Sequence, residues 1–110
     1  MDVKSKEIII SKEFGRNFAD VFNFGKICFG FSQAEKYNIT ILHIIESLKK
    51  FYSFYPECRY LRTKNKIYRN IILDAHIIIY RITEKNIEVL DIIHSASSIR
   101  RIQKTRSIKI

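Results

Sequence analysis

The residues best suited to chemistry are basic side chains gathered near the middle of the chain. Five of them fall within eleven residues, with two tyrosines between them: Arg59, Tyr60, Arg62, Lys64, Lys66, Tyr68 and Arg69. Arg and Lys can neutralise phosphates, and Tyr can stack on an unpaired base, which is the chemistry of contact with single-stranded RNA. Arg can also stabilise a phosphate undergoing transfer. The alternative interpretation is a solvated basic face of an antiparallel sheet.

Two further candidates lie later in the chain. His94 ends the last predicted strand, where a sheet meets its C-terminal loop, and a His there can move protons if its pKa is shifted. Arg81 alternates with Tyr80 in a predicted strand, so one of the two faces the helices. An Arg on the apolar side would need a carboxylate, and the next strand offers Asp91 or Glu88.

The charge of the chain is placed unevenly. The formal net charge is +9; residues 1–55 hold 8 basic and 6 acidic side chains, whereas residues 56–110 hold 12 and 5, including the pair Arg100 and Arg101. Such a field favours a polyanion, such as nucleic acid, or an acidic protein partner. A genome biased toward Ile and Lys would also raise the charge, but it would not cluster it after residue 56.

Several classes of protein are excluded by missing patterns. The sequence has no phosphate-binding glycine loop, no nucleophile motif and no zinc-ligand spacing, so we expect neither a metal nor a cofactor. Cys28 and Cys58 stand apart, and residues 1–12 lack the apolar core of a secretion signal, which indicates a reduced, cytoplasmic protein. No apolar run approaches the ~18 residues that cross a bilayer, so no membrane partner is expected.

The hydrophobic pattern predicts two helices after a short strand at residues 7–10. Ser11 is a candidate N-cap, and apolar residues then recur at helical spacing as far as Gly30. Ser32 and Glu35 have the form of a capping box, which predicts that the second helix starts there and ends before Pro56. The two helices form an antiparallel hairpin.

Four short strands are predicted after this hairpin, at residues 59–63, 67–73, 76–82 and 87–93, with a short helix at residues 99–103. The order β-α-α-β-β-β-β predicts an α+β fold in which the hairpin packs on one face of an antiparallel sheet of four to five strands. The position of the first strand stays open. The chain forms a single domain, 1–110, with a core at about 7–103 and a basic C-terminal tail at 104–110.

This order of elements resembles the RelE/ParE toxin superfamily of bacterial toxin-antitoxin modules, over residues 7–103. The resemblance rests on Pro56 after the second helix, the pair Tyr68-Arg69, the segment HIIIYRI at residues 76–82, and IEVLDIIH closing the sheet. It implies a toxin that a cognate antitoxin neutralises, by acidic or apolar side chains on the basic sheet face or in the helix-hairpin groove. RelE-like members cleave mRNA on the ribosome without a metal, whereas ParE-like members poison DNA gyrase.

Two departures favour a ParE-like growth inhibitor over an mRNA endoribonuclease. Ile77 stands where cleaving relatives often carry Arg, and residues 95–98 intervene between His94 and the next Arg pair. Two alternatives remain: RelE-type mRNA cleavage, and a non-toxic basic RNA-binding domain. For cleavage, the expected catalytic residues are Arg69, His94, Lys64 and Lys66. The residues expected to bind a nucleic acid or target are Arg59, Arg62, Tyr68, Arg81, Arg100 and Arg101.

Overall fold

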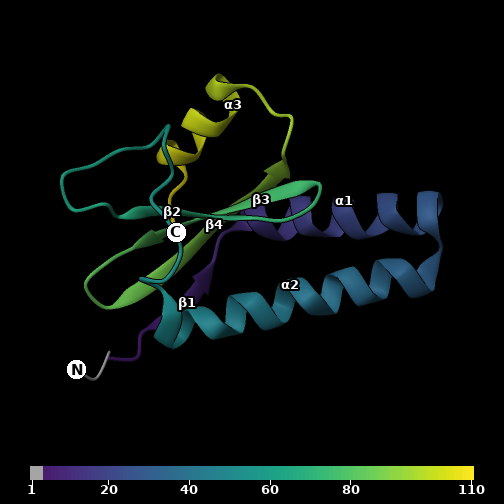
Figure 1. Ribbon diagram of the computed structural model, residues 1–110, viewed down its shortest axis with the longest axis horizontal. Coiled ribbons are helices and arrows are strands. Elements are labelled where there is room, and N and C mark those ends of the chain that lie inside the picture. Colours follow the sequence, from purple (N-terminus) through teal and green to yellow (C-terminus); the bar gives the residue numbers. More distant parts are fainter. Residues whose placement is uncertain (1–3) are drawn as a thin grey trace.

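The computed structural model describes residues 4–110 as a helical hairpin on one face of a sheet and a short helical segment on the other (Figure 1). The elements in chain order are β1 Glu7–Ile10, α1 Lys12–Phe29, α2 Phe31–Phe51, β2 Tyr68–Ile72, β3 His76–Ile82, β4 Asn86–His94, α3 Ile99–Gln103 and the 3₁₀ turn η1 Lys104–Ser107. The predicted α+β class, with the hairpin on one face, is confirmed.

A single residue, Gly30, connects the two helices of the hairpin. Ser11 caps α1 as predicted, because its side chain accepts a hydrogen bond from the Phe14 amide. Gly30 has φ of 89°, which lets α2 begin directly at Phe31. The predicted capping box is therefore wrong: Ser32 lies inside α2, because Gly30 reverses the chain earlier than a Ser cap would.

The sheet has the order β1-β4-β3-β2. The strands β2, β3 and β4 are antiparallel neighbours, while β1 lies parallel to β4 at the edge. The predicted strand at residues 59–63 is wrong. This segment forms turns, since Leu61 donates its amide to the Cys58 carbonyl, and both side chains are buried. The sheet therefore has four strands, and β1 supplies the fourth.

The core has two parts, one on each face of the sheet. Under the hairpin, Tyr80 and Ile78 of β3 are fully buried against residues of α1 and α2. On the opposite face, Ile79 and its neighbours are covered by the segment after α2 and by the C-terminal residues, where Ile102 and Ile108 are buried. No helix within residues 4–110 is long and apolar enough to cross a membrane.

Candidate functional site

A β-bulge in β4 shapes the end of the sheet where polar side chains gather. The register of β3 with β4 shifts between Ile79 and Tyr80, so that Val89 pairs with Tyr80 while Asp91 pairs with Ile79, leaving Leu90 as the extra residue. The edge strand β1 pairs with β4 only as far as Val89. Beyond Val89, this edge of β4 has no strand partner among the described residues, and the start of α1 lies next to it.

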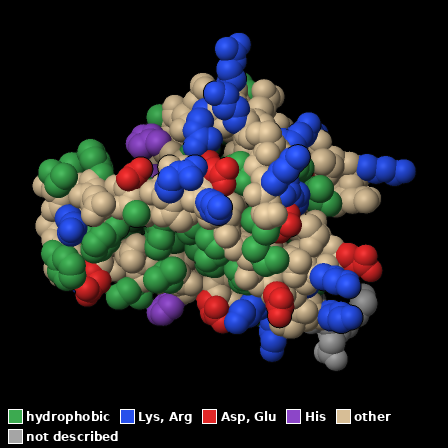
Figure 2. All heavy atoms as spheres, turned by 180° about the vertical axis from the view of Figure 1, so that it is seen from behind, with side chains coloured by type: hydrophobic (Ala, Val, Ile, Leu, Met, Phe, Trp, Pro, Cys, Tyr) green, Lys and Arg blue, Asp and Glu red, His purple; other side chains and the backbone are tan. Residues whose placement is uncertain are grey.

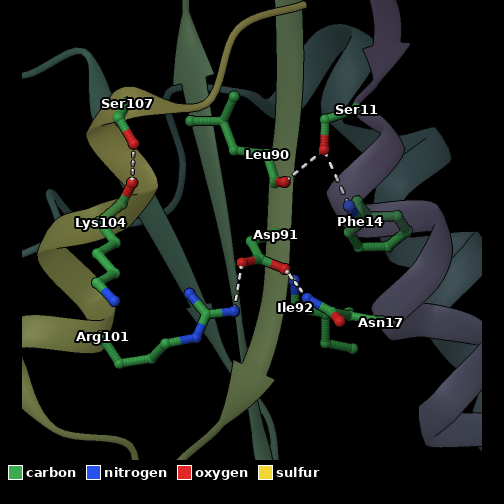
Figure 3. Close-up of polar contacts among 9 residues, drawn as sticks. All are labelled: Ser11, Phe14, Asn17, Leu90, Asp91, Ile92, Arg101, Lys104 and Ser107. Carbon is green, nitrogen blue, oxygen red and sulfur yellow. Dashed lines mark hydrogen bonds and ion pairs between the residues drawn. The ribbon is translucent and has the colours of Figure 1, made fainter.

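Ser11 fixes the start of α1 beside this edge. Its amide donates to the Val89 carbonyl at 3.0 Å, and its hydroxyl donates to the Leu90 carbonyl while accepting from the Phe14 amide. The first turn of α1 is thereby held against β4 (Figure 3). This attachment brings the polar residues of α1 to the bulge.

The carboxylate of Asp91 joins the two sides of the molecule. It accepts hydrogen bonds from Asn17 Nδ2 of α1 at 2.6 Å and from the Ile92 amide at 2.9 Å, and its other oxygen pairs with Arg101 Nη2 of α3 at 2.8 Å (Figure 3). Asp91 is 1 % exposed. Its charge is therefore buried but fully partnered, as buried charges must be.

A shallow, open pocket of about 240 Å³ lies next to this ion pair. Its lining is mostly polar and comes from α1, β3, β4, the loop before α3 and α3 itself: Asn17, Asp20, Val21, His76, Ile92, Ile93, His94, Ser97 and Arg101. The pocket thus brings together two of the predicted residues, His94 and Arg101. No group of three metal-ligating side chains occurs among residues 4–110.

The two histidines of the pocket face each other across the strand pair. His76 opens β3 and pairs with His94 at the end of β4, and their ring centroids are 5.8 Å apart. Burial lowers the pKa of His76, and the nearby His94 lowers it further. Both effects favour the uncharged form of His76.

Tyr37 of α2 extends this pair into a chain of three titratable groups. Its hydroxyl lies 2.9 Å from His76 Nδ1. Burial raises the pKa of Tyr37, with a further rise from Asp74, so its hydroxyl keeps its proton and can donate it to the ring. At the other end, His94 Nδ1 accepts a hydrogen bond from the Ala96 amide at 3.0 Å, so that only its Nε2 remains available to a ligand.

The remaining predicted catalytic residues lie at the other end of the sheet. Arg69 pairs with Tyr80, four residues along β3 from His76, which corresponds to about 13 Å at about 3.3 Å per residue. Lys64 and Lys66 lie in the turn before β2 and are exposed. The predicted set of Lys64, Lys66, Arg69 and His94 therefore does not converge on one point.

Arg69 is engaged with the backbone. Its guanidinium donates to the carbonyl oxygens of Lys66 at 2.8 Å, Ser53 at 3.0 Å and Tyr55 at 2.8 Å. These contacts tie the end of α2 and the turn before β2 to the sheet. The geometry gives Arg69 a role in holding this loop.

Arg81 has a carboxylate partner on the next strand, as the sequence suggested. Its Nε pairs with Glu88 at 2.6 Å, and its other nitrogens donate to the Tyr68 hydroxyl and the Ile108 carbonyl. Tyr68 itself is buried. The partner is Glu88 because Asp91 turns toward α1 and α3.

Comparison with known proteins assigns the chain to a family. A family model described as "ParE toxin of type II toxin-antitoxin system, parDE" matches residues 8–99. This chain belongs to the ParE toxin family. The predicted membership of the RelE/ParE superfamily and the toxin function are thereby confirmed. A toxin of a ParDE system has a cognate ParD antitoxin as its partner.

The solved structures support the fold of the toxin. A chain of "Chromosomal ParDE TA system from P. aeruginosa" aligns with a TM-score of 0.68 and 14 % sequence identity, over 83 % of this chain and 97 % of that chain. At this identity the likeness concerns the fold alone. A search of curated protein sequences finds no match.

Three of the hydrogen-bonding residues in and next to the toxin's pocket were not predicted from the sequence. Tyr37 fits the apolar face of α2, Asn17 carries no motif, and His76 reads as an ordinary first residue of a strand. The position of His76 near His94 could have been inferred from the sequence, because a tight turn between β3 and β4 brings the start of β3 next to the end of β4. The bulge decides which residue of β4 it meets.

The residues predicted to bind a target lie mostly on the side of the sheet opposite the hairpin. Arg59 and Arg62 belong to the segment between α2 and β2, and Arg100 belongs to α3; all three are exposed. In Figure 2, many Lys and Arg side chains lie toward the α3 side at the top and another group lies at the lower right, while hydrophobic side chains gather toward the tip of the hairpin. Tyr68 and Arg81 lie under this surface rather than on it.

Proposed function

We propose that the toxin arrests growth in the cytoplasm by poisoning DNA gyrase and that its antitoxin holds it inactive. The observation that carries the choice of target is the separation of the predicted nuclease residues. Arg69 is engaged with three carbonyl oxygens, and His94 lies at the opposite end of the strands. Ile77 packs against the core on the second face, where cleaving relatives often carry Arg.

Induction of the toxin without its antitoxin tests the target. We expect arrested growth, induction of the DNA-damage response and gyrase trapped on cleaved DNA, while cellular mRNA stays intact. Coexpression of the antitoxin should abolish all three effects. Growth arrest without trapped gyrase would contradict the proposal.

A second candidate function, ribosome-dependent mRNA cleavage, has one observation in its favour. The pocket is lined by His76, His94 and Arg101, and the Tyr37 hydroxyl lies 2.9 Å from His76 Nδ1. Metal-free cleavage of RNA needs a base, an acid and a cation near the phosphate, and these side chains are chemically capable of all three. The pocket is open to solvent, as a site for a large substrate must be.

Primer extension on mRNA from induced cells distinguishes the two functions. Cleavage would give new 5′ ends in translated message, and His94→Ala should remove them while His43→Ala, at an exposed position of α2, should not. Intact message in the presence of growth arrest would eliminate this second candidate.

We further propose that the antitoxin covers the tip of the hairpin. Four large apolar side chains there are more than half exposed: Phe24, Ile27, Phe29 and Phe31. Exposed apolar groups gathered in this way mark an interface with another protein. Replacing Ile27 and Phe29 by Ser should prevent copurification of the antitoxin, whereas replacing exposed Lys12 and Lys36 by Gln should not.

A further inference from the structure

Nearly all the net charge of the toxin lies in two segments on the side of the sheet opposite the hairpin. We call residues 56–67 and 95–110 the basic layer. Together they hold nine basic side chains and one acidic side chain, a net charge of +8 out of +9 for the whole chain. Both segments pack on the same apolar cluster of the sheet, through Cys58 and Leu61 from the first and Ile102 and Ile108 from the second. The fold therefore joins two charge clusters into one.

The cations of this layer are free to bind a partner. Among the described residues, Arg101 is the one cation of the layer that pairs with a carboxylate, that of Asp91 in β4. The other eight are exposed and form no ion pair within residues 4–110: Arg59, Arg62, Lys64, Lys66, Arg100, Lys104, Arg106 and Lys109. The single acid, Glu57, accepts the Thr63 amide and does not neutralise any of them.

The chemistry of this surface fits a polyanion better than a folded protein. Interfaces between proteins rely on apolar and aromatic anchors at their centre. In the basic layer most large apolar side chains point into the core, and Ile99 and Ile110 are the exposed exceptions among the described residues. The exposed apolar surface lies mainly on the hairpin, on the other side of the sheet.

The aromatic rings in the basic layer and directly beneath it favour a double-stranded ligand. Proteins that hold single strands stack successive bases on exposed rings. Here Tyr68 is buried beneath the guanidinium groups of Arg81 and Arg106, each 5.7 Å from the ring centroid, and Arg59 lies over Tyr60 at 5.5 Å. These rings are covered by arginine side chains, so the exposed groups that a ligand can contact are mainly the cations.

We propose that the basic layer binds the phosphate backbone of duplex DNA without sequence preference. Binding of this kind comes from the release of counterions and has dissociation constants on the order of 10⁻⁴ to 10⁻⁶ M at physiological salt. Binding of duplex DNA by the basic layer does not depend on whether DNA gyrase is the target of the toxin. A toxin that holds duplex DNA in this way would be concentrated on the chromosome.

The test is a titration of the full-length toxin against a fluorescent 30-base-pair duplex of random sequence, without gyrase or antitoxin, at several salt concentrations. The test variant replaces Lys64, Arg100, Lys104 and Lys109 by Gln. The matched control removes the same residue types from the hairpin, replacing Lys12, Arg16, Lys36 and Lys50 by Gln. The net charge of the two variants is identical.

We expect the wild type and the control to bind with the same slope of log K against log salt, because the hairpin cations face away from the DNA. For the test variant, the slope of log K against log salt should become shallower by about 0.9 for each phosphate contact removed. Its affinity for the duplex should fall at least tenfold. Equal slopes for the two variants would show that binding follows net charge alone and would overturn the proposal. So would tighter binding of an acidic peptide or of single-stranded DNA than of the duplex.

The outcome is separate from that of the gyrase experiment. A toxin that traps gyrase but binds no free duplex would overturn the inference about the basic layer and leave the target standing. Duplex binding without trapped gyrase would do the reverse.

Discussion

Asp91 of β4 and Arg101 of α3 form an ion pair of 2.8 Å in which the Asp91 side chain is almost completely buried and the Arg101 side chain is 38 % exposed. The same carboxylate accepts a hydrogen bond from Asn17 of α1. One side chain therefore attaches elements on both faces of the sheet to its central strand.

The two partners should differ in the cost of their removal. Arg101→Met leaves a buried carboxylate without its cation and should lower the free energy of unfolding by about 3 kcal/mol. Asp91→Asn leaves a guanidinium that can turn to water, so it should cost about 1–2 kcal/mol. Urea unfolding measures both. Equal costs, or a larger cost for Asp91→Asn, would show that burial of the carboxylate does not dominate.

His76 should make the stability of the toxin depend on pH. Its pKa is lowered in the folded state, so between that value and the ordinary value of about 6.5 the unfolded chain binds more protons. The stabilisation is fully present above about pH 6.5 and declines as the pH falls below it. Unfolding at pH 5.5 and 7.5 should show a smaller difference for His76→Gln than for the wild type, while His43→Gln should behave as the wild type does.

Arg69→Ala should destabilise the fold. The change removes three hydrogen bonds from a charged group to carbonyl oxygens, partly in solvent, and should cost about 1–2 kcal/mol in urea unfolding. Arg69→Lys should not restore the loss, because an ammonium group cannot reproduce the planar fork of the guanidinium. Arg59→Ala is the control, because Arg59 is exposed and its side chain makes no hydrogen bond within residues 4–110; an equal loss there would contradict this role.

Replacement of glycine by alanine should have opposite effects on stability at two positions of the hairpin. Gly30 has φ of 89° and ψ of 162°, a region almost restricted to Gly, so Gly30→Ala should cost about 1–3 kcal/mol. Gly15 lies within α1 with open space around it, so Gly15→Ala should stabilise by about 0.5–1 kcal/mol. Thermal unfolding measures both. A stable Gly30→Ala variant would mean that the hairpin turn can relax.

The hydrophobic pattern was sufficient for most elements. The period of the apolar residues, the Ser11 cap and Gly30 placed the hairpin, and the β-branched runs placed β2, β3 and β4 within two residues of their observed ends. The segment at residues 59–63 misled because Cys58 and Leu61 are buried by a turn rather than by a strand. Burial alone does not specify backbone conformation over so few residues.

The sequence by itself determined the family, the helical hairpin and the excess of charge in the second half, because these depend on residue order and local periodicity. Only the tertiary structure decided which residues that are distant in the sequence come into contact. Without the bulge at Leu90, the tight turn after β3 would place Ile93 opposite His76; the extra residue shifts the register by one and brings His94 there instead. The pocket, the partners of Asp91 and the merging of two basic segments into one layer all follow from such long-range placement, which no local pattern encodes.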